Sequence, residues 1–178
     1  MKYVALLRGI NVGGNNKVKM SDLKILFEEE GLKNVRTYIN SGNVLFETEE
    51  NIEKITEELE RKILKDLNVS SPIVTVSSEE LENIKDNAPK TWKKTDDLRK
   101  YVAFVKKPHR PEDVMKEIET REGVDSIDKG PGVIYMSTTL EGITKSRLSR
   151  HIGKPTYKLI TIRNFNTVEK LLKLCGTI

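Results

Sequence analysis

Short apolar runs alternate with helical stripes along the first half of the chain. Four runs are typical of strands, and they span residues 3–7, 35–39, 44–46 and 72–76. After the first, third and fourth runs, apolar residues recur at every third or fourth position, which predicts three helices. The expected element order is therefore strand, helix, strand, strand, helix, strand, with one further helix.

Capping and stop residues indicate where these helices begin and end. Ser21 is expected to cap the first helix and Gly31 to end it. Ser77 and Glu80 have the spacing of a capping box for the third helix, which is expected to stop at Pro89. The order predicts an α+β fold, specifically the ferredoxin-like β-α-β-β-α-β plait, in which helices cover an antiparallel sheet.

The second half of the chain repeats this pattern. The run 100–106 matches the run 2–8 in four identical residues followed by three conservative changes, at an offset of 98. The elements expected after it are a helix from Pro111 to Gly123, a hairpin around 130–132, a short helix carrying Leu148 and Ile152, a strand over 157–162 and a closing helix. We therefore predict two tandem ferredoxin-like lobes related by an internal repeat, each with an extra C-terminal helix. The predicted division is a first lobe over 1–89, a linker over 90–98 and a second lobe over 99–178.

The glycine- and asparagine-rich connection after the first strand is longer than its counterpart in the second half. The first strands are offset by 98 residues but the hairpins, at Ser41 and Gly130, by only 89, so the first half carries about nine extra residues. The excess lies between Arg8 and Ser21, because the second half passes from strand to helix within 106–111. A connection longer than its repeat requires is typical of a functional loop.

The predicted topology brings this loop to the same end of the sheet as the hairpin turn 40–43. Glycine backbone and amide side chains there predict a cradle for a small phosphate- or carboxylate-bearing ligand. In the alternative interpretation the asparagines only form turns, and Arg8 pairs with a helix carboxylate such as Glu29. The candidate ligand-binding residues are Arg8, Gly9, Asn11, Gly13, Gly14, Asn15, Asn40, Ser41, Gly42 and Asn43.

Composition is typical of a globular chain. Of 178 residues, 37% are hydrophobic and 33% charged, and no run approaches the roughly 18 apolar residues of a membrane helix. The single cysteine, Cys175, allows no internal disulfide and is expected in the core. These features predict a cytoplasmic protein without a membrane partner, and they leave the oligomeric state open.

Charge is distributed unevenly between the halves. Residues 1–89 carry a net charge of −4 and residues 90–178 a net charge of +8. Either the halves attract each other, or the second half presents a basic face to nucleic acid. If the second half binds nucleic acid, the contacts are expected from one face of a short helix that also bears His151. In the other interpretation this helix face is only exposed to solvent. The nucleic-acid candidates are Lys145, Arg147 and Arg150.

Several enzyme classes are disfavoured by the residues that the loop lacks. Gly9 and Gly14 have the glycine spacing of a P-loop, but Asn15 and Asn16 stand where that motif requires Lys and Ser or Thr. The loop also misses the dinucleotide-binding glycine pattern. No histidine is expected near Ser41 for a nucleophile triad, and two histidines with one cysteine give no convincing metal site. An enzyme of unidentified class stays an alternative, and no cofactor is indicated.

Four segments resemble a known family. They are the opening run 3–14, the pair Met20 and Leu23, the run 37–44 and the run 161–168, which reads Thr-Ile-Arg-Asn-Phe-Asn-Thr-Val. The chain resembles the uncharacterised bacterial proteins of domain-of-unknown-function family 1697 over nearly its whole length. This resemblance implies two ferredoxin-like lobes, implies no activity, and adds Arg163 and Asn164 as residues that complete the cradle. In the alternative interpretation these two residues only begin the closing helix, with an asparagine as N-cap.

Overall fold

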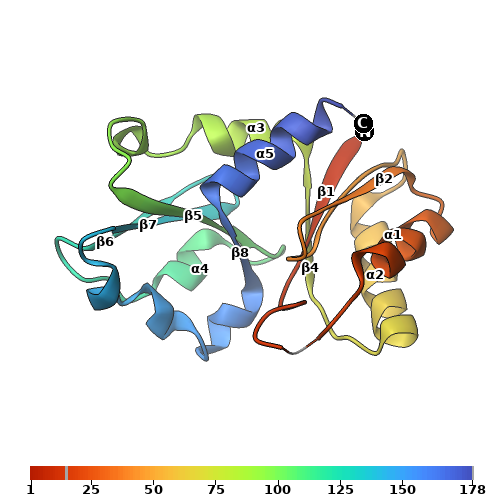
Figure 1. Ribbon diagram of the computed structural model, residues 1–178, viewed down its shortest axis with the longest axis horizontal. Helices are drawn as coiled ribbons and strands as arrows, with labels where there is room; N and C mark the ends of the chain where they lie inside the picture. Colours follow the sequence, from red (N-terminus) through yellow and green to blue (C-terminus); the bar gives the residue numbers. More distant parts are fainter. Residues whose placement is uncertain (15, 178) are drawn as a thin grey trace. The chain divides into compact units, whose positions relative to one another are not determined.

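The computed structural model describes residues 1–14 and 16–177, and the chain forms two compact units (Figure 1). The first unit comprises Met1–Leu81 together with Lys170–Ile178, and the second unit comprises Glu82–Glu169. Each unit contains a four-stranded antiparallel sheet accompanied by helices. The predicted α+β class is thereby confirmed.

The sheet of the first unit has the strand order β2-β3-β1-β4. Its core lies on the face covered by two helices, where Ala5 and Leu7 of β1 pack in one cluster with the helical residues Phe27 and Leu59. The Phe27 ring meets the Phe46 ring of β3 edge to face, with centroids 5.7 Å apart. The elements are β1 (Lys2–Leu7), α1 (Met20–Glu29), β2 (Lys33–Tyr38), β3 (Asn43–Glu47), α2 (Ile52–Leu67) and β4 (Ile73–Ser77).

The sheet of the second unit has the strand order β6-β7-β5-β8. One face carries Ala103 and Ile134, which pack with Val114 of the short helix α4. Where the first unit has the long helix α2, the second unit has three short 3₁₀ helices between β7 and β8. The elements are β5 (Leu98–Val105), α4 (Pro111–Met115), β6 (Asp125–Lys129), β7 (Val133–Thr139), the 3₁₀ helices η2 (Ile143–Lys145), η3 (Leu148–His151) and η4 (Pro155–Leu159), and β8 (Ile160–Asn164).

Two helices, α3 (Ser78–Asp86) and α5 (Phe165–Cys175), contain residues of both units. Within the second unit, Trp92 of the 3₁₀ helix η1 (Lys90–Lys93) packs edge to face on Tyr135, at a centroid distance of 5.6 Å. In the part of the chain that the structure describes, no helix is long and apolar enough to cross a membrane.

Some predicted helix ends are confirmed and others are wrong. Ser77 and Glu80 form the predicted capping box, with Glu80 N donating to Ser77 Oγ (3.0 Å) and Ser77 N to Glu80 Oε2 (2.8 Å). Ser21 does not cap α1, because the helix already begins at Met20. The helix that begins at Pro111 ends four residues later instead of continuing towards residue 123. Local capping residues therefore predicted where α3 begins, but they did not predict where α1 begins or how far α4 extends.

Candidate functional site

The loop that follows β1 leaves the sheet at one defined point. The backbone N–H of Arg8 donates to Pro72 O (3.0 Å), and the Ser71 hydroxyl donates to Arg8 O (2.8 Å). Both partners lie directly before β4, which neighbours β1 in the sheet. The main chain of Arg8 is therefore held on both sides, and its side chain is half-buried. Ser71 has no motif around it that would have identified this role from the sequence.

Asn11 joins the beginning of the loop, its end and the hairpin turn. Its side-chain amide donates to Val18 O and to Asn40 O, each at 2.9 Å, and its Oδ1 accepts from Val18 N at 2.8 Å. Its backbone N–H donates to Asn16 O at 3.0 Å. Asn11 has a φ of +54°, which asparagine tolerates better than most residues. Its side chain thus holds three segments in one arrangement, which is more than an ordinary turn residue does.

The tip of the loop exposes its backbone. Gly13 and Gly14 have φ values of +62° and +79°, in the left-handed region that glycine adopts readily. Gly9 has a φ of +71° and Asn11 a φ of +54°, whereas Ile10 between them has no positive φ, so the sign of φ alternates over these three residues. Such alternation is typical of backbone concavities that bind anions. All three glycines are exposed, and no atom lies within 4 Å of the position that a Cβ would occupy.

The hairpin turn packs closely against the base of the loop. Leu7 N donates to Gly42 O at 2.8 Å. A Cβ on Gly42 would lie 2.8 Å from Leu7 Cβ and 2.8 Å from Ile10 Cδ1, so only glycine fits here. The fully buried Asn43 donates through its amide to Tyr38 O and Ser41 Oγ, both at 3.1 Å. The structure therefore brings loop and turn into direct contact.

Two exposed apolar side chains accompany these polar groups. Val12 in the loop is 62% exposed, and Ile39 in the turn is 50% exposed. Ile39 also has a φ of +49°, which is rare for a β-branched residue because its Cβ substituents crowd the backbone. The sequence interpretation missed Ile39, since a β-branched residue at the end of an alternating run is typical of an ordinary strand.

The structure brings most candidate residues of the first unit together. Those around Asn11, Asn40 and Gly42 lie together through the contacts above, while Asn15 lies outside the described residues. The carboxylate of Glu29, which one interpretation paired with Arg8, pairs with Lys62 (3.1 Å).

Arg163 and Asn164 lie at the end of β8, where both have local contacts. The guanidinium of Arg163 donates to Thr161 Oγ1 (3.0 Å) and to Ile162 O (2.9 Å). Burial lowers the pKa of Arg163 to about 10. Asn164 Oδ1 accepts from Asn166 N at 3.0 Å, as expected of an N-cap directly before α5.

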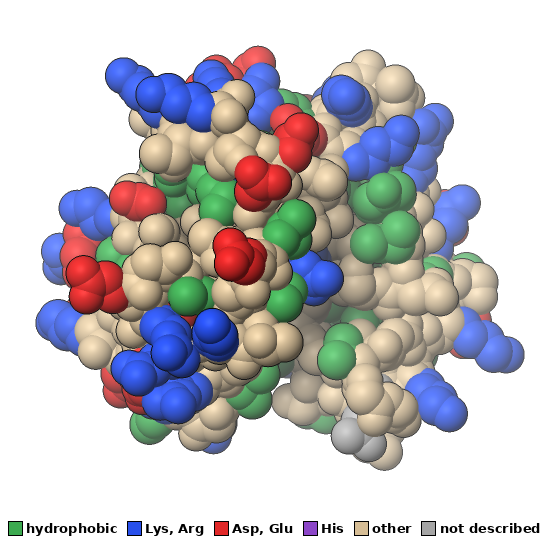
Figure 2. Space-filling view, turned by 60° about the vertical axis from the view of Figure 1, so that its left-hand side comes forward, with side chains coloured by type: hydrophobic (Ala, Val, Ile, Leu, Met, Phe, Trp, Pro, Cys, Tyr) green, Lys and Arg blue, Asp and Glu red, His purple; other side chains and the backbone are tan. Residues whose placement is uncertain are grey.

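The basic stretch 145–151 differs from its prediction. It is not an α-helix but forms 3₁₀ turns, so its basic residues do not share one helical face. Lys145 and Arg147 are exposed, Arg150 pairs with Glu119 (3.2 Å), and His151 is only 3% exposed. Lys and Arg side chains are not confined to this stretch, since Figure 2 shows them over much of the visible face, with one dense group at the lower left of its view.

Within residues 1–14 and 16–177, no three His, Cys, Asp or Glu side chains are grouped so that they could hold a metal ion.

Comparisons with known proteins identify relatives but no activity. The family model described as "Protein of unknown function (DUF1697)" matches residues 1–135. Among solved structures, the chain is similar to the conserved bacterial protein SP0830 from Streptococcus pneumoniae, at 30% sequence identity and a TM-score of 0.83 over 98% of both chains. No curated protein matches the chain.

Proposed function

The chain belongs to the DUF1697 family, and we propose that it binds a small phosphate- or carboxylate-bearing ligand at the loop 8–16 and the turn 40–43. The observation that carries this proposal is the backbone of the loop, in which the exposed Gly9, Gly13 and Gly14 all have a positive φ. Its glycines have open space where side chains would stand, so an anion could approach the N–H groups closely.

Preorganisation supports the same proposal. An anion-binding loop gains affinity when its conformation does not have to be ordered on binding. Three side-chain hydrogen bonds of Asn11 hold the loop, and the close contact of Gly42 with Leu7 and Ile10 holds the turn beneath it. The ligand would therefore meet a backbone that is already arranged.

Positive charge around the loop favours an anion over a neutral ligand. Arg8 lies at the start of the loop, and hydrogen bonds hold its main chain in place. The exposed Lys17 and Lys19 lie between the end of the loop and α1. Arginine can form two parallel hydrogen bonds to a phosphate or carboxylate, and lysine adds a point charge. These side chains would attract the ligand, whereas the glycine backbone would determine its position.

We also infer that both units are ferredoxin-like plaits that arose as an internal repeat. Equivalent strand orders, β2-β3-β1-β4 and β6-β7-β5-β8, support this inference. The division into lobes 1–89 and 99–178 with the linker 90–98 stays a prediction.

Nucleic-acid binding by the second unit is the alternative. The exposure of Lys145 and Arg147 favours it, whereas the ion pair between Arg150 and Glu119 weakens it. Such binding would weaken steeply as the salt concentration rises. Replacing Lys145 and Arg147 together would make the plot of log K against log salt concentration less steep, by the equivalent of about two phosphate contacts. Binding insensitive to both changes would exclude this alternative.

Melting-temperature shifts test the proposed site. The ligands are inorganic phosphate, nucleoside monophosphates, sugar phosphates and short dicarboxylates. At about 100 times Kd, a ligand that binds only the folded chain stabilises it by about 2.7 kcal/mol. For a chain of this size that is a rise of roughly 5 to 10 °C.

Matched glycine variants localise the effect. Gly13→Ala and Gly31→Ala both place a Cβ at positive φ in open space, so they carry similar strain, but only Gly13 lies in the loop. We expect the ligand shift to be lost in Gly13→Ala and in Arg8→Ala, and kept in Gly31→Ala. If no ligand raises the melting temperature, or if all variants respond alike, the proposal is wrong.

A further inference from the structure

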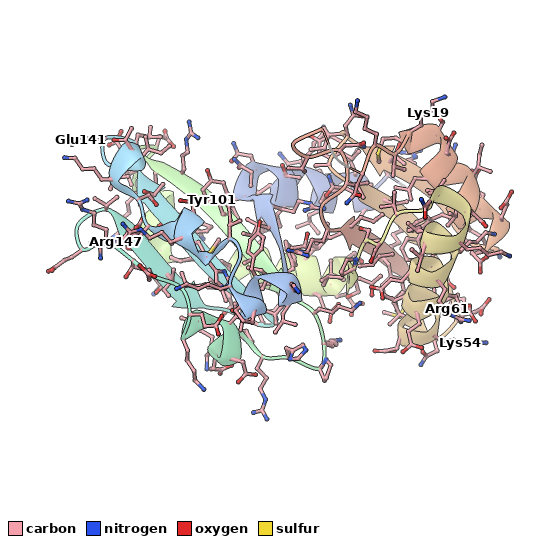
Figure 3. The ribbon with its side chains drawn as sticks, turned by 90° about the horizontal axis from the view of Figure 1, so that it is seen from below. Lys19, Lys54, Arg61, Tyr101, Glu141 and Arg147 are labelled. Carbon is pink, nitrogen blue, oxygen red and sulfur yellow. The ribbon has the colours of Figure 1, made fainter. Side chains whose placement is uncertain are left out.

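A second cavity lies within the second unit, on the face of its sheet next to η2, η3 and η4. Its volume is about 360 Å³, within the range of roughly 300 to 1,000 Å³ that is typical of small-molecule sites. Tyr101, Met136 and Ile162 from three adjacent strands line it, and Leu148 and Tyr157 line it from the short helices. In Figure 3, Tyr101 is labelled on the pale-green strand β5, alongside the blue segment of short helices.

The cavity coincides with the segment where the expected helix is missing. A long amphipathic helix on this face would place a continuous apolar stripe against the strands. The 3₁₀ turns instead present irregular side chains, and Ile152, expected in the helix stripe, is 63% exposed. Leu148 and Tyr157 pack on this face of the sheet, but the partly buried strand residues Tyr101 and Ile162 line an open space beside them.

The wall of the cavity is fixed although it is irregular. The Asp125 carboxylate accepts from Ser146 Oγ (2.6 Å), from Arg147 N (2.8 Å) and from Arg121 N (3.0 Å). Burial raises the pKa of Asp125, but these hydrogen bonds outweigh it, so the pKa is below its usual value. Thr138 Oγ1 lies near enough to contribute to this lowering, although within the described residues it has no partner at hydrogen-bond geometry.

The far end of the wall is held by a second set of contacts. The Thr156 hydroxyl donates to Glu117 Oε2 (2.5 Å) and lies 2.7 Å from His151 Nε2. Lys154 Nζ donates to Glu117 O (2.8 Å) and to Glu119 Oε1 (2.9 Å). Because both ends of the segment are anchored, the cavity is preformed and does not require ordering on binding.

The charge of the lining selects a class of ligand. Arg99 is the one permanently charged residue among the described lining residues, and none of them is acidic. Burial lowers the pKa of His151, which favours its neutral form at neutral pH. The cavity therefore combines apolar and aromatic side chains with several Ser and Thr side chains and a single exposed guanidinium. The apolar part together with one positive charge matches an apolar body that carries one negative charge.

We propose that this cavity binds an apolar monocarboxylate, with its hydrocarbon or aromatic body against Tyr101, Met136 and Leu148 and its carboxylate on Arg99. The site lies wholly within the second unit and does not depend on the function proposed for the glycine loop.

Amide chemical-shift mapping with defined probes tests this proposal. The probes are phenylacetate, 3-phenylpropanoate, hexanoate and octanoate, each paired with its neutral carboxamide. We expect saturable shifts at residues 99–101, 136–138 and 143–162, with Kd at or below about 1 mM for at least one acid. No saturable shift in these segments with any acid would overturn the proposal.

Two arginine variants separate the assigned role from general charge. Arg99→Gln should weaken binding of the acid by about tenfold and leave the carboxamide unchanged, since it removes a charge-assisted hydrogen bond from an exposed group. Arg147→Gln removes an exposed neighbouring charge outside the lining and should change neither. Equal weakening in both variants would overturn the role of Arg99. Shifts confined to residues 8–14 would overturn this site while supporting the glycine loop.

Discussion

Replacing Asn11 with Asp should loosen the glycine loop without changing its shape. The substitution is isosteric and keeps the Oδ1 that accepts from Val18 N. It replaces the amide that donates to Val18 O and Asn40 O with a second acceptor, 2.9 Å from each carbonyl oxygen. Two net hydrogen bonds of about 1 kcal/mol each are lost, and repulsion between oxygens adds to this. For a half-buried group we expect a local cost of about 2 to 3 kcal/mol.

Amide hydrogen exchange measures this local cost directly. A loss of 2 to 3 kcal/mol in the opening free energy should speed exchange of the Val18 N–H by about 30- to 150-fold.

The introduced carboxyl also predicts a pH dependence. Only its protonated form can donate to the carbonyl oxygens, so its pKa in the folded chain should lie above the unfolded value of about 3.9. The stabilising contribution is then complete below that value and is lost as pH rises through the folded pKa.

Asn34→Asp is the control for the loop variant. Asn34 is also left-handed, at +53°, but exposed, so this change should alter stability by less than about 0.5 kcal/mol. The reasoning is refuted if Val18 exchange is unchanged in Asn11→Asp, or if both variants behave alike.

Three further predictions concern stability. Gly42→Ala should destabilise the first unit by about 2 to 4 kcal/mol in urea denaturation, because it adds steric overlap to the strain of positive φ, whereas Gly31→Ala should cost only about 1 kcal/mol. Tyr135→Phe should cost about 1 to 2 kcal/mol, measured by Trp fluorescence, because it removes the buried hydrogen bond to Ile84 O (2.6 Å); an unchanged midpoint would contradict this. Burial lowers the pKa of His151, so the contribution of the neutral imidazole to stability is complete above pH of about 6.5 and is lost as the pH falls through the pKa of the folded chain. In His151→Gln, stability should therefore fall less over this pH range. A variant with the same dependence of stability on pH as the original chain would contradict this.

The fold class could be predicted from the sequence because its signals are local. Apolar runs such as 3–7 and 35–39 predicted strands close to β1 and β2, and the reciprocal capping box of Ser77 and Glu80 formed as expected. Residue type and spacing alone determine these features.

The segment between β7 and β8 could not be predicted in the same way. Leu148 and Ile152 have helical spacing, but Asp125, far away in sequence, takes up the Ser146 hydroxyl and the Arg147 N–H. This tertiary contact competes with a weak helical tendency, and the segment that follows it contains the buried His151 and lines the cavity.

The candidate site was only partly predictable. Gly and Asn content pointed to the loop, and the expected strand neighbours placed it beside the turn 40–43. The specific link from Asn11 to Val18 and Asn40 depends on side-chain geometry that composition does not contain. Ile39 at positive φ contradicts its own propensity, so no local rule would have indicated it.

Titration with inorganic phosphate, followed by amide chemical shifts, tests the central claim most directly. If the glycine backbone binds the anion, the amides of residues 9–14 should shift together and saturably, and Gly13→Ala should abolish the shift while Gly31→Ala retains it. Shifts that grow linearly with ionic strength, or that occur only at exposed lysines and arginines, would contradict an anion site in this loop.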